Sequence, residues 1–190
     1  MKSLLLAVAA LLWLAAPLSA QEKKATPHPV TVTYYLSHVE CSSCVETIKD
    51  AVLKVPGVTD IDLTEDEPFA RISFDSHVAS YHQIAQAVIS SESGGEKYAP
   101  LIKLKIPDYA KGDNTAKIDA IFAKQKADVR VETLDREKGE FKLIFLPLKV
   151  DAARKGPQGW NLGKFWHPIH DAPPAGLGLA ITTMDEPKKK

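Results

Sequence analysis

Residues 38–58 read HVECSSCVETIKDAVLKVPGV, and this segment decides how the rest of the chain is interpreted. It holds the two cysteines of the chain, Cys41 and Cys44, with two serines between them. Aliphatic residues then recur at spacings of three and four, at Val45, Ile48, Val52 and Val55. That period predicts one buried face of a helix, which Pro56-Gly57 would end. The segment therefore predicts a loop with two thiols that leads directly into an amphipathic helix.

Alternating and helical patterns flank this helix in a regular order. Period-two alternation predicts strands, and the three-to-four period predicts one further helix. The expected strands are 30–36, 58–63, 69–74 and 101–106, and the second helix is 78–89. The resulting order, β-α-β-β-α-β, is that of the ferredoxin-like fold, in which two helices cover one face of a four-stranded antiparallel sheet. We therefore expect an α+β ferredoxin-like domain over residues 30–107.

The remainder of the chain predicts a second, irregular α+β domain over residues 108–184. A helix is expected at 115–126, followed by a hairpin of strands 129–134 and 140–150, and a short strand at 177–183. Pro147 should place the second hairpin strand at a sheet edge or a bulge. The domain is either a degenerate second ferredoxin-like copy, which we favour, or an unrelated extension. In both cases it would share or abut the strand near Leu101.

The N-terminal residues of the chain predict export. Residues 1–20 combine Lys2, an apolar run from Leu4 to Leu14 and small residues at the end, which is the layout of a signal peptide. The apolar run is shorter than the ~20 residues that span a bilayer, although an uncleaved anchor is the alternative. Residues 21–29 would form a flexible lead-in and 185–190 a polar tail. We expect a periplasmic or secreted protein without stable membrane insertion after cleavage.

Composition and motifs exclude several classes of function. The 24 basic and 24 acidic residues balance, so no charge excess indicates a nucleic-acid partner. Two cysteines this close cannot join distant parts of the chain, so a disulfide scaffold is excluded. The sequence has no nucleophile elbow, Walker loop, dinucleotide-binding loop or HExxH pair. We do not expect an enzyme.

The segment 38–58 resembles the heavy-metal-associated domain of copper chaperones, metal-ATPase N-terminal modules and periplasmic mercury-binding proteins. Their Gly-Met-x-Cys-x-x-Cys pattern precedes a helix that ends in a Pro-Gly-type break and a valine. His38 and Val39 stand here in place of Gly-Met, and Val39 can still anchor the loop. The resemblance implies that Cys41 and Cys44 are metal ligands. It also implies that Lys97 or Tyr98, from the loop before the last strand, could lie near the metal.

The chemistry of the thiol pair points to a soft metal ion. A cysteine at a helix start is close to unpaired N–H groups, which favour the thiolate. Two thiolates suit Cu(I) first, with Hg(II) or Ag(I) behind it, whereas structural Zn(II) usually takes four ligands. Metal scavenging, buffering or transfer to and from a partner protein would follow. His38, three residues before Cys41, is an accessory candidate, although an exposed loop histidine is the simpler interpretation.

Two other functions stay open from the residues alone. A CxxC that opens a helix is also typical of thiol-disulfide redox proteins, although the element order here differs from theirs. The pair could instead form an idle disulfide in an interaction module that binds no metal.

The other histidines give weaker signals. His167 and His170, three residues apart, are weak candidates for a second metal site. Pro168 argues against a helix there, and the neighbouring Trp160, Phe165 and Trp166 more simply fill a small core. His28 belongs to the lead-in, and we expect no special role for His77 or His82 beside the second helix.

Overall fold

The computed structural model describes residues 27–93 and 96–185, so the expected signal peptide and most of the lead-in and tail lie outside the described residues. The strands are β1 (Pro29–Tyr35), β2 (Val58–Leu63), β3 (Phe69–Asp75), β4 (Glu92–Ser93), β5 (Glu96–Lys97), β6 (Leu101–Lys105), β7 (Val129–Asp135), β8 (Glu140–Phe145) and β9 (Thr182–Thr183). The helices are α1 (Ser42–Leu53), α2 (Tyr81–Ser90), α3 (Asn114–Ala123) and α4 (Gly163–His170). Within these ranges we find no helix with the length and apolar character that crossing a bilayer needs.

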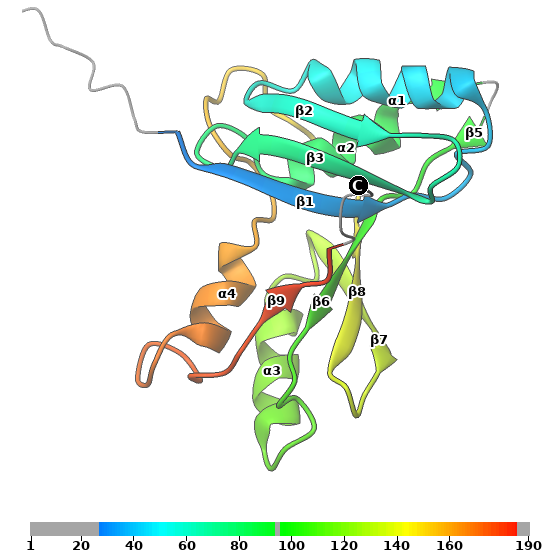
Figure 1. Cartoon of the computed structure of the whole chain (residues 1–190). Helices are drawn as coiled ribbons and strands as arrows, with labels where there is room; N and C mark the ends of the chain where they lie inside the picture. The colour runs from blue at the N-terminus through cyan, green and yellow to red at the C-terminus, as the bar shows by residue number, and fades with distance from the viewer. Residues whose placement is uncertain (1–26, 94–95, 186–190) are drawn as a thin grey trace, which may run out of the picture.

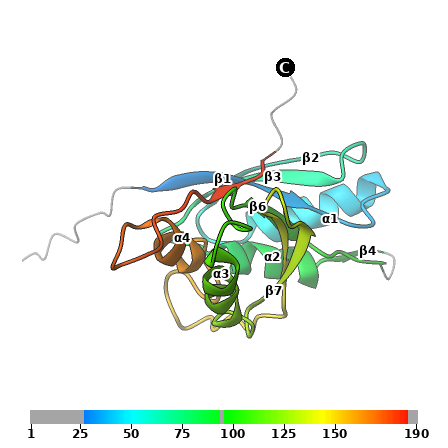
Figure 2. The same cartoon turned by 90° about the horizontal axis from the view of Figure 1, so that it is seen from below.

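The first half has the ferredoxin-like arrangement that the sequence predicts. Its strands lie in the order β2-β3-β1-β6, and every neighbouring pair is antiparallel. Helices α1 and α2 lie together on one face of this layer (Figure 2). Apolar side chains of both helices are buried there, including Ile48, Val52 and Ile84, each fully shielded from solvent. The fold prediction for the first half is confirmed.

Helix α2 begins three residues later than the sequence predicts, because a capping box fixes its start. The side-chain oxygen of Ser80 accepts the backbone N–H of Gln83, and the Gln83 side chain accepts the backbone N–H of Ser80. This reciprocal pair satisfies two N–H groups that the first turn leaves unpaired. Residues 78 and 79 therefore belong to the preceding turn.

The second half repeats the strand order of the first and uses β6 in both. Its elements follow as β6-α3-β7-β8-α4-β9, and its strands lie in the order β7-β8-β6-β9. On the edge opposite β8, β6 pairs with β1 through Leu101 and Tyr35 alone. Further along the same edge, Leu104 and Lys105 of β6 pair with β9. Figure 1 shows β6 leaving the first layer at β1 and continuing into the second. One strand therefore connects the two layers.

A shared aromatic core joins the halves. Trp160 is fully buried, with ring centroids 5.8 Å from Tyr81 of α2, 5.9 Å from Phe145 of β8 and 5.1 Å from Phe165 of α4. Trp166 is only partly buried. The expected core of Trp160 and Phe165 is confirmed, and it reaches into both layers.

Two predictions that depend on proline are wrong. Pro168 lies inside α4, where Phe165 and Ile169 are completely buried, so packing of one apolar face outweighs the lost backbone hydrogen bond. Pro147 lies beyond the end of β8 at Phe145, and β8 is a central strand between β6 and β7. The strand expected at 177–183 is also shorter, since only Thr182–Thr183 pairs with β6.

Candidate metal centre

The two cysteines lie where the loop after β1 meets α1. Cys41 is the N-cap of the helix, in an extended conformation, and Cys44 is in the first turn. Their Cα atoms are 5.1 Å apart and a disulfide joins the side chains. The backbone N–H of Cys44 donates both to Sγ of Cys41, at 3.1 Å, and to its carbonyl oxygen, at 2.9 Å. The sulfur of Cys41 therefore caps the helix in the way a serine oxygen often does.

The two sulfurs differ in their access to solvent. Cys44 is 5% exposed and belongs to the core that also contains Val45 and Ile48. Cys41 is only partly buried. Val39 is buried beneath the loop, as expected for an apolar anchor. Cys41 is therefore the more accessible of the two cysteines.

Two features beside Cys41 would favour negative charge on its sulfur once the disulfide is reduced. The first turn of α1 contains no acidic residue, and its N–H groups form the positive end of the helix dipole. The hydroxyl of Ser43 lies 3.1 Å from Sγ of Cys41. The hydroxyl of Ser42 instead donates to Glu65 at 2.8 Å. The contact of Ser43 was not expected from the sequence, although its position inside the motif is the signal that could have suggested it.

His38, three residues before Cys41, has a backbone conformation that is typical of glycine. Its φ of +62° is the one positive value at a non-glycine residue among the described residues. A side chain in this left-handed region is costly for most residues. The His38 side chain is exposed. The loop before Cys41 therefore turns at a residue where glycine would be favoured.

The remaining accessory candidates lie in the segment before β6. Lys97 ends β5, and its side chain lies outside what the structure describes. Tyr98 is 2% exposed, and its hydroxyl is buried without a hydrogen-bond partner among the described residues. The next backbone N–H, of Ala99, donates to the hydroxyl of Ser37 at 3.3 Å. This contact ties the Tyr98 segment to the loop that leads to His38.

The weaker histidine candidates lie at the end of α4. Nδ1 of His167 is 3.2 Å from Oδ2 of Asp171, while the ring of His170 lies against Trp166 with centroids 4.6 Å apart. Over residues 27–93 and 96–185 no three His, Cys, Asp or Glu side chains are gathered closely enough to hold a metal ion. The thiol pair is therefore a two-ligand arrangement in the described part of the chain.

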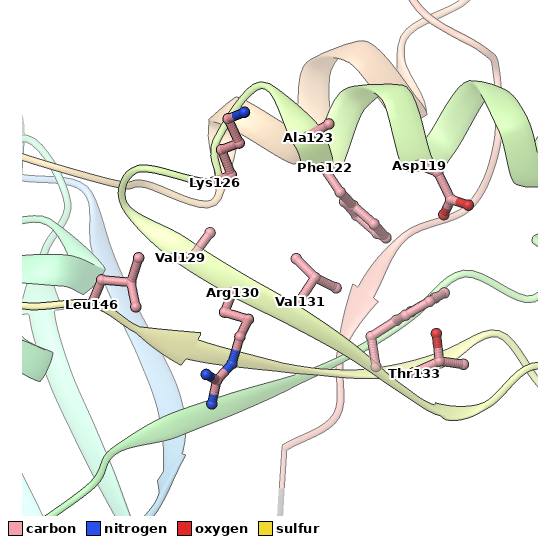
Figure 3. A pocket seen from close by; sticks show the side chains of 10 residues that line it. Asp119, Phe122, Ala123, Lys126, Val129, Arg130, Val131, Thr133 and Leu146 are labelled. Carbon is pink, nitrogen blue, oxygen red and sulfur yellow. The ribbon is translucent and has the colours of Figure 1, made fainter.

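A cavity of about 420 Å³ lies in the second half, between α3 and the β7–β8 hairpin. Figure 3 shows Phe122 pointing from α3 toward Val131 of β7. The residues that line the cavity are Asp119, Phe122, Ala123, Lys126, Val129, Arg130, Val131, Thr133, Phe141 and Leu146. The lining contains neither a thiol nor an imidazole, so this cavity offers no ligand that soft metals prefer.

The thiol pair lies within the part of the chain that matches a known family profile. The family profile described as the heavy-metal-associated domain matches residues 33–92. Over 57 residues the chain is 37% identical to the mercuric transport protein periplasmic component of an Alcaligenes species. That match covers 30% of this chain and spans 63% of the length of the relative.

Solved structures of similar proteins were also found. Oxidised MerP from Ralstonia metallidurans CH34 is 29% identical, with 38% of this chain and 97% of that chain covered and a TM-score of 0.34. The water-soluble region of the P-type ATPase CopA from Bacillus subtilis is 13% identical, with 63% and 78% covered and a TM-score of 0.37.

Proposed function

Because residues 33–92 match the profile of the heavy-metal-associated domain, we propose that this chain binds a soft metal ion through the thiolates of Cys41 and Cys44, outside the cytoplasm. The observation that carries the proposal is the meeting of both sulfurs at the start of α1, with Cys41 open to solvent. The ion is cargo, to be scavenged, buffered or passed on. The relative named as a periplasmic component of mercuric transport supports both the metal class and export.

Metal binding requires that the disulfide first be reduced. A dithiol reductant supplies two electrons and two protons to the S–S bond and becomes a disulfide itself. The two freed thiols then lose their protons as two metal–sulfur bonds form. The positive end of α1 and the Ser43 hydroxyl both favour the resulting negative charge. The oxidised pair, with no free thiolate, would bind no ion.

Ligand exchange at this pair should run through Cys41. Metal–sulfur bonds of about 2.3 Å hold two thiolates roughly 4 Å or more apart, so the sulfurs must separate when the ion enters. Cys44 is packed in the core, whereas Cys41 lies in the loop outside the helix. Cys41 is therefore the side chain free to move, and a partner's thiol would attack the ion from its side.

The ion is best tested as a choice between Cu(I) and Hg(II). Cu(I) remains our first candidate, since two thiolates suit a soft ion of low coordination number. Hg(II) gains weight from the mercuric relative, Ag(I) shares the same chemistry, and Zn(II) would need further ligands.

Accessory contacts are proposed for His38, Lys97 and Tyr98. Tyr98 has a buried hydroxyl without a partner, in a segment tied to Ser37 by a hydrogen bond. His38 is exposed on the loop just before the pair. Replacing His38 with glycine removes the imidazole while keeping the backbone conformation, so any loss of affinity in that variant would identify His38 as a ligand.

The test is titration of the fully reduced chain, without oxygen, with Cu(I) or Hg(II) against a competing thiol chelator. We expect one ion per chain in the wild type and none of comparable affinity in the Cys41→Ser/Cys44→Ser variant. The Ser42→Ala variant, at the first residue of α1 between the two cysteines, is a matched control and should bind as the wild type does. Equal binding by the wild type and the double variant would refute the proposal.

The disulfide keeps one rival function in view, namely thiol-disulfide exchange. A redox protein would equilibrate with glutathione and have a reduction potential near that of catalytic disulfides, about −120 to −270 mV. Catalysed dithiol exchange with a model substrate, together with no ion bound by the reduced chain, would favour this rival. An interaction module with a vestigial pair would show neither activity.

A further inference from the structure

Two histidines from distant parts of the sequence meet at the start of β1. The ring centroids of His28 and His77 are 5.2 Å apart, with a tilt of 34° between the planes. Both side chains are exposed. They line a cavity of about 350 Å³ whose other walls include Tyr81, Asn161, Trp166 and His167. The pair therefore stands at the mouth of a cavity to which both halves of the chain contribute.

Backbone hydrogen bonds hold the two histidines in place. One carboxylate oxygen of Asp75 accepts the backbone N–H of His28 at 3.2 Å and that of His77 at 2.9 Å. The backbone N–H of Ser76 donates to the carbonyl of His28 at 3.1 Å. His28 is thus anchored to the turn that follows β3, although it precedes the first residue of β1. The fold of the chain therefore sets the distance between the two rings.

A hydrogen bond with Ser76 also holds the ring of His28. The Ser76 hydroxyl lies 2.9 Å from Nδ1 of His28 and 3.3 Å from the carbonyl oxygen of the same residue. When the hydroxyl donates to the carbonyl, its oxygen accepts a hydrogen bond from the protonated Nδ1. A proton on Nδ1 leaves the lone pair of the neutral ring on Nε2. Metal-binding histidines are commonly oriented in this way, by a hydrogen bond from the nitrogen that does not bind the metal.

We propose that His28 and His77 form a second metal site, which binds a divalent ion with a preference for imidazole, Cu(II) above all. Imidazoles bound to one ion through bonds of about 2.0–2.1 Å have ring centroids roughly 4.5–5 Å apart, close to the spacing seen here. Cu(II) binds nitrogen ligands most tightly among the common divalent ions. Because no third protein ligand is gathered with the pair in the described residues, water completes the coordination.

A second feature of the cavity supports an occupant that carries water. Oδ1 of Asn161, in the cavity wall, is buried without a hydrogen-bond partner among the described residues. Such an acceptor is costly to leave unpaired. Water that enters the same cavity would supply the donor that this oxygen lacks.

The histidine pair is independent of the thiol pair. Figure 1 shows the start of β1 at one end of the first layer and the start of α1 at the other. The seven residues of β1 separate the two sites by roughly 20 Å. The proposal therefore does not rest on the function assigned to the thiols. One site suits a soft ion and the other a borderline ion.

The test uses the untagged chain as the Cys41→Ser/Cys44→Ser variant, in which no thiol can reduce or bind Cu(II). Cu(II) is titrated against glycine as competitor, and the bound ion is examined by electron paramagnetic resonance. We expect one Cu(II) per chain, with nitrogen couplings from two imidazoles. Replacing either histidine with alanine should weaken binding at least ~10-fold, because one anchored ligand no longer raises the local concentration of the other.

His170→Ala is the matched control, since it removes another exposed histidine outside the pair and should leave the affinity unchanged. Circular dichroism checks that each variant is folded, and His77→Gln serves as a second replacement that keeps a polar side chain. Unchanged Cu(II) affinity in the His28→Ala/His77→Ala variant would overturn the proposal. An equal loss in His170→Ala would also overturn it, because binding would then belong to surface histidines in general.

Discussion

His82 and Trp160 exchange two hydrogen bonds across the boundary between the halves. The backbone N–H of His82 donates to the carbonyl of Trp160 at 3.3 Å, and the backbone N–H of Trp160 donates to Nδ1 of His82 at 3.2 Å. Since Nδ1 accepts, the ring proton is on Nε2, which donates to the carbonyl of Leu146 at 2.6 Å. His82 is 1% exposed. Its neutral ring therefore joins α2 to two segments of the second half, one at Leu146 and the other at Trp160.

This geometry predicts that acid weakens the junction. Burial lowers the pKa of His82 below its ordinary value of 6.5, although the hydrogen bond to Leu146 acts in the opposite direction. The folded chain therefore binds fewer protons than the unfolded chain, and stability is lost as pH falls below about 6.5. The free energy of unfolding should therefore rise with pH over this range, with a slope below the ~1.4 kcal/mol per pH unit that one whole proton would give. Urea unfolding between pH 7.5 and 5.5 measures it.

The control for this pH dependence is His82→Gln, which cannot take up the proton. The variant should be less stable than the wild type at pH 7.5 but lose less stability on acidification. Identical slopes in the two proteins would show that other groups cause the pH dependence.

Gly159 should be intolerant of a side chain because it faces the same histidine. A Cβ at Gly159 would lie 2.6 Å from Nδ1 of His82, and the φ of +76° adds strain. Gly156 also has a positive φ, of +87°, but a Cβ there meets nothing within 4 Å. Gly156→Ala measures the backbone strain of about 1 kcal/mol, and Gly159→Ala should cost at least twice that in unfolding free energy. Equal costs would show that the close approach to His82 is unimportant.

His38→Gly should stabilise the fold. The φ of +62° costs a histidine about 1 kcal/mol more than a glycine. Thermal unfolding of the oxidised chain should therefore shift upward in His38→Gly and downward in His38→Val, whose branched side chain tolerates this region poorly. A destabilised glycine variant would mean that the imidazole makes a stabilising contact.

Ser43 should raise the reactivity of the cysteine beside it. Its hydroxyl is 3.1 Å from Sγ of Cys41 and can donate to the thiolate. In the reduced Cys44→Ser variant, Ser43→Ala should slow the reaction of Cys41 with iodoacetamide at neutral pH by about 2- to 10-fold, the equivalent of one modest hydrogen bond. The hydroxyl of Ser42 donates to Glu65 instead, so Ser42→Ala should leave the rate unchanged. Similar rates in all three proteins would contradict a role for Ser43.

Sequence periodicity predicted most elements because each layer buries one face. Strand β2 was predicted to the residue, and the apolar period through Ile48 and Val52 correctly indicated the buried face of α1. Helix α4 was missed because Pro168 outweighed a short apolar face whose burial depends on tertiary packing. The positive φ of His38 could not be expected from the sequence pattern, because residues other than glycine adopt this region uncommonly, although histidine does so more often than most.

Contacts between distant segments also could not be predicted from the sequence periodicity. The meeting of His28 and His77 depends on the β1–β3 register, which pairs Pro29 with Asp75. The double use of β6 was foreseen only as a strand shared or abutted near Leu101. We propose that residues 108–184 are a degenerate second ferredoxin-like domain, on the basis of the repeated strand order. Segment 107–114, at the position equivalent to the thiol loop, has no cysteine. The role that we propose for this second domain is therefore docking or stability.

The most direct test of the metal assignment is X-ray absorption of the reduced chain loaded with one Cu(I), and separately with one Hg(II). We expect a first coordination shell that contains two sulfur atoms, and we expect this shell to disappear in the Cys41→Ser/Cys44→Ser variant. A shell of nitrogen and oxygen alone in the wild type would contradict it, as would an ion held equally well while the disulfide is intact.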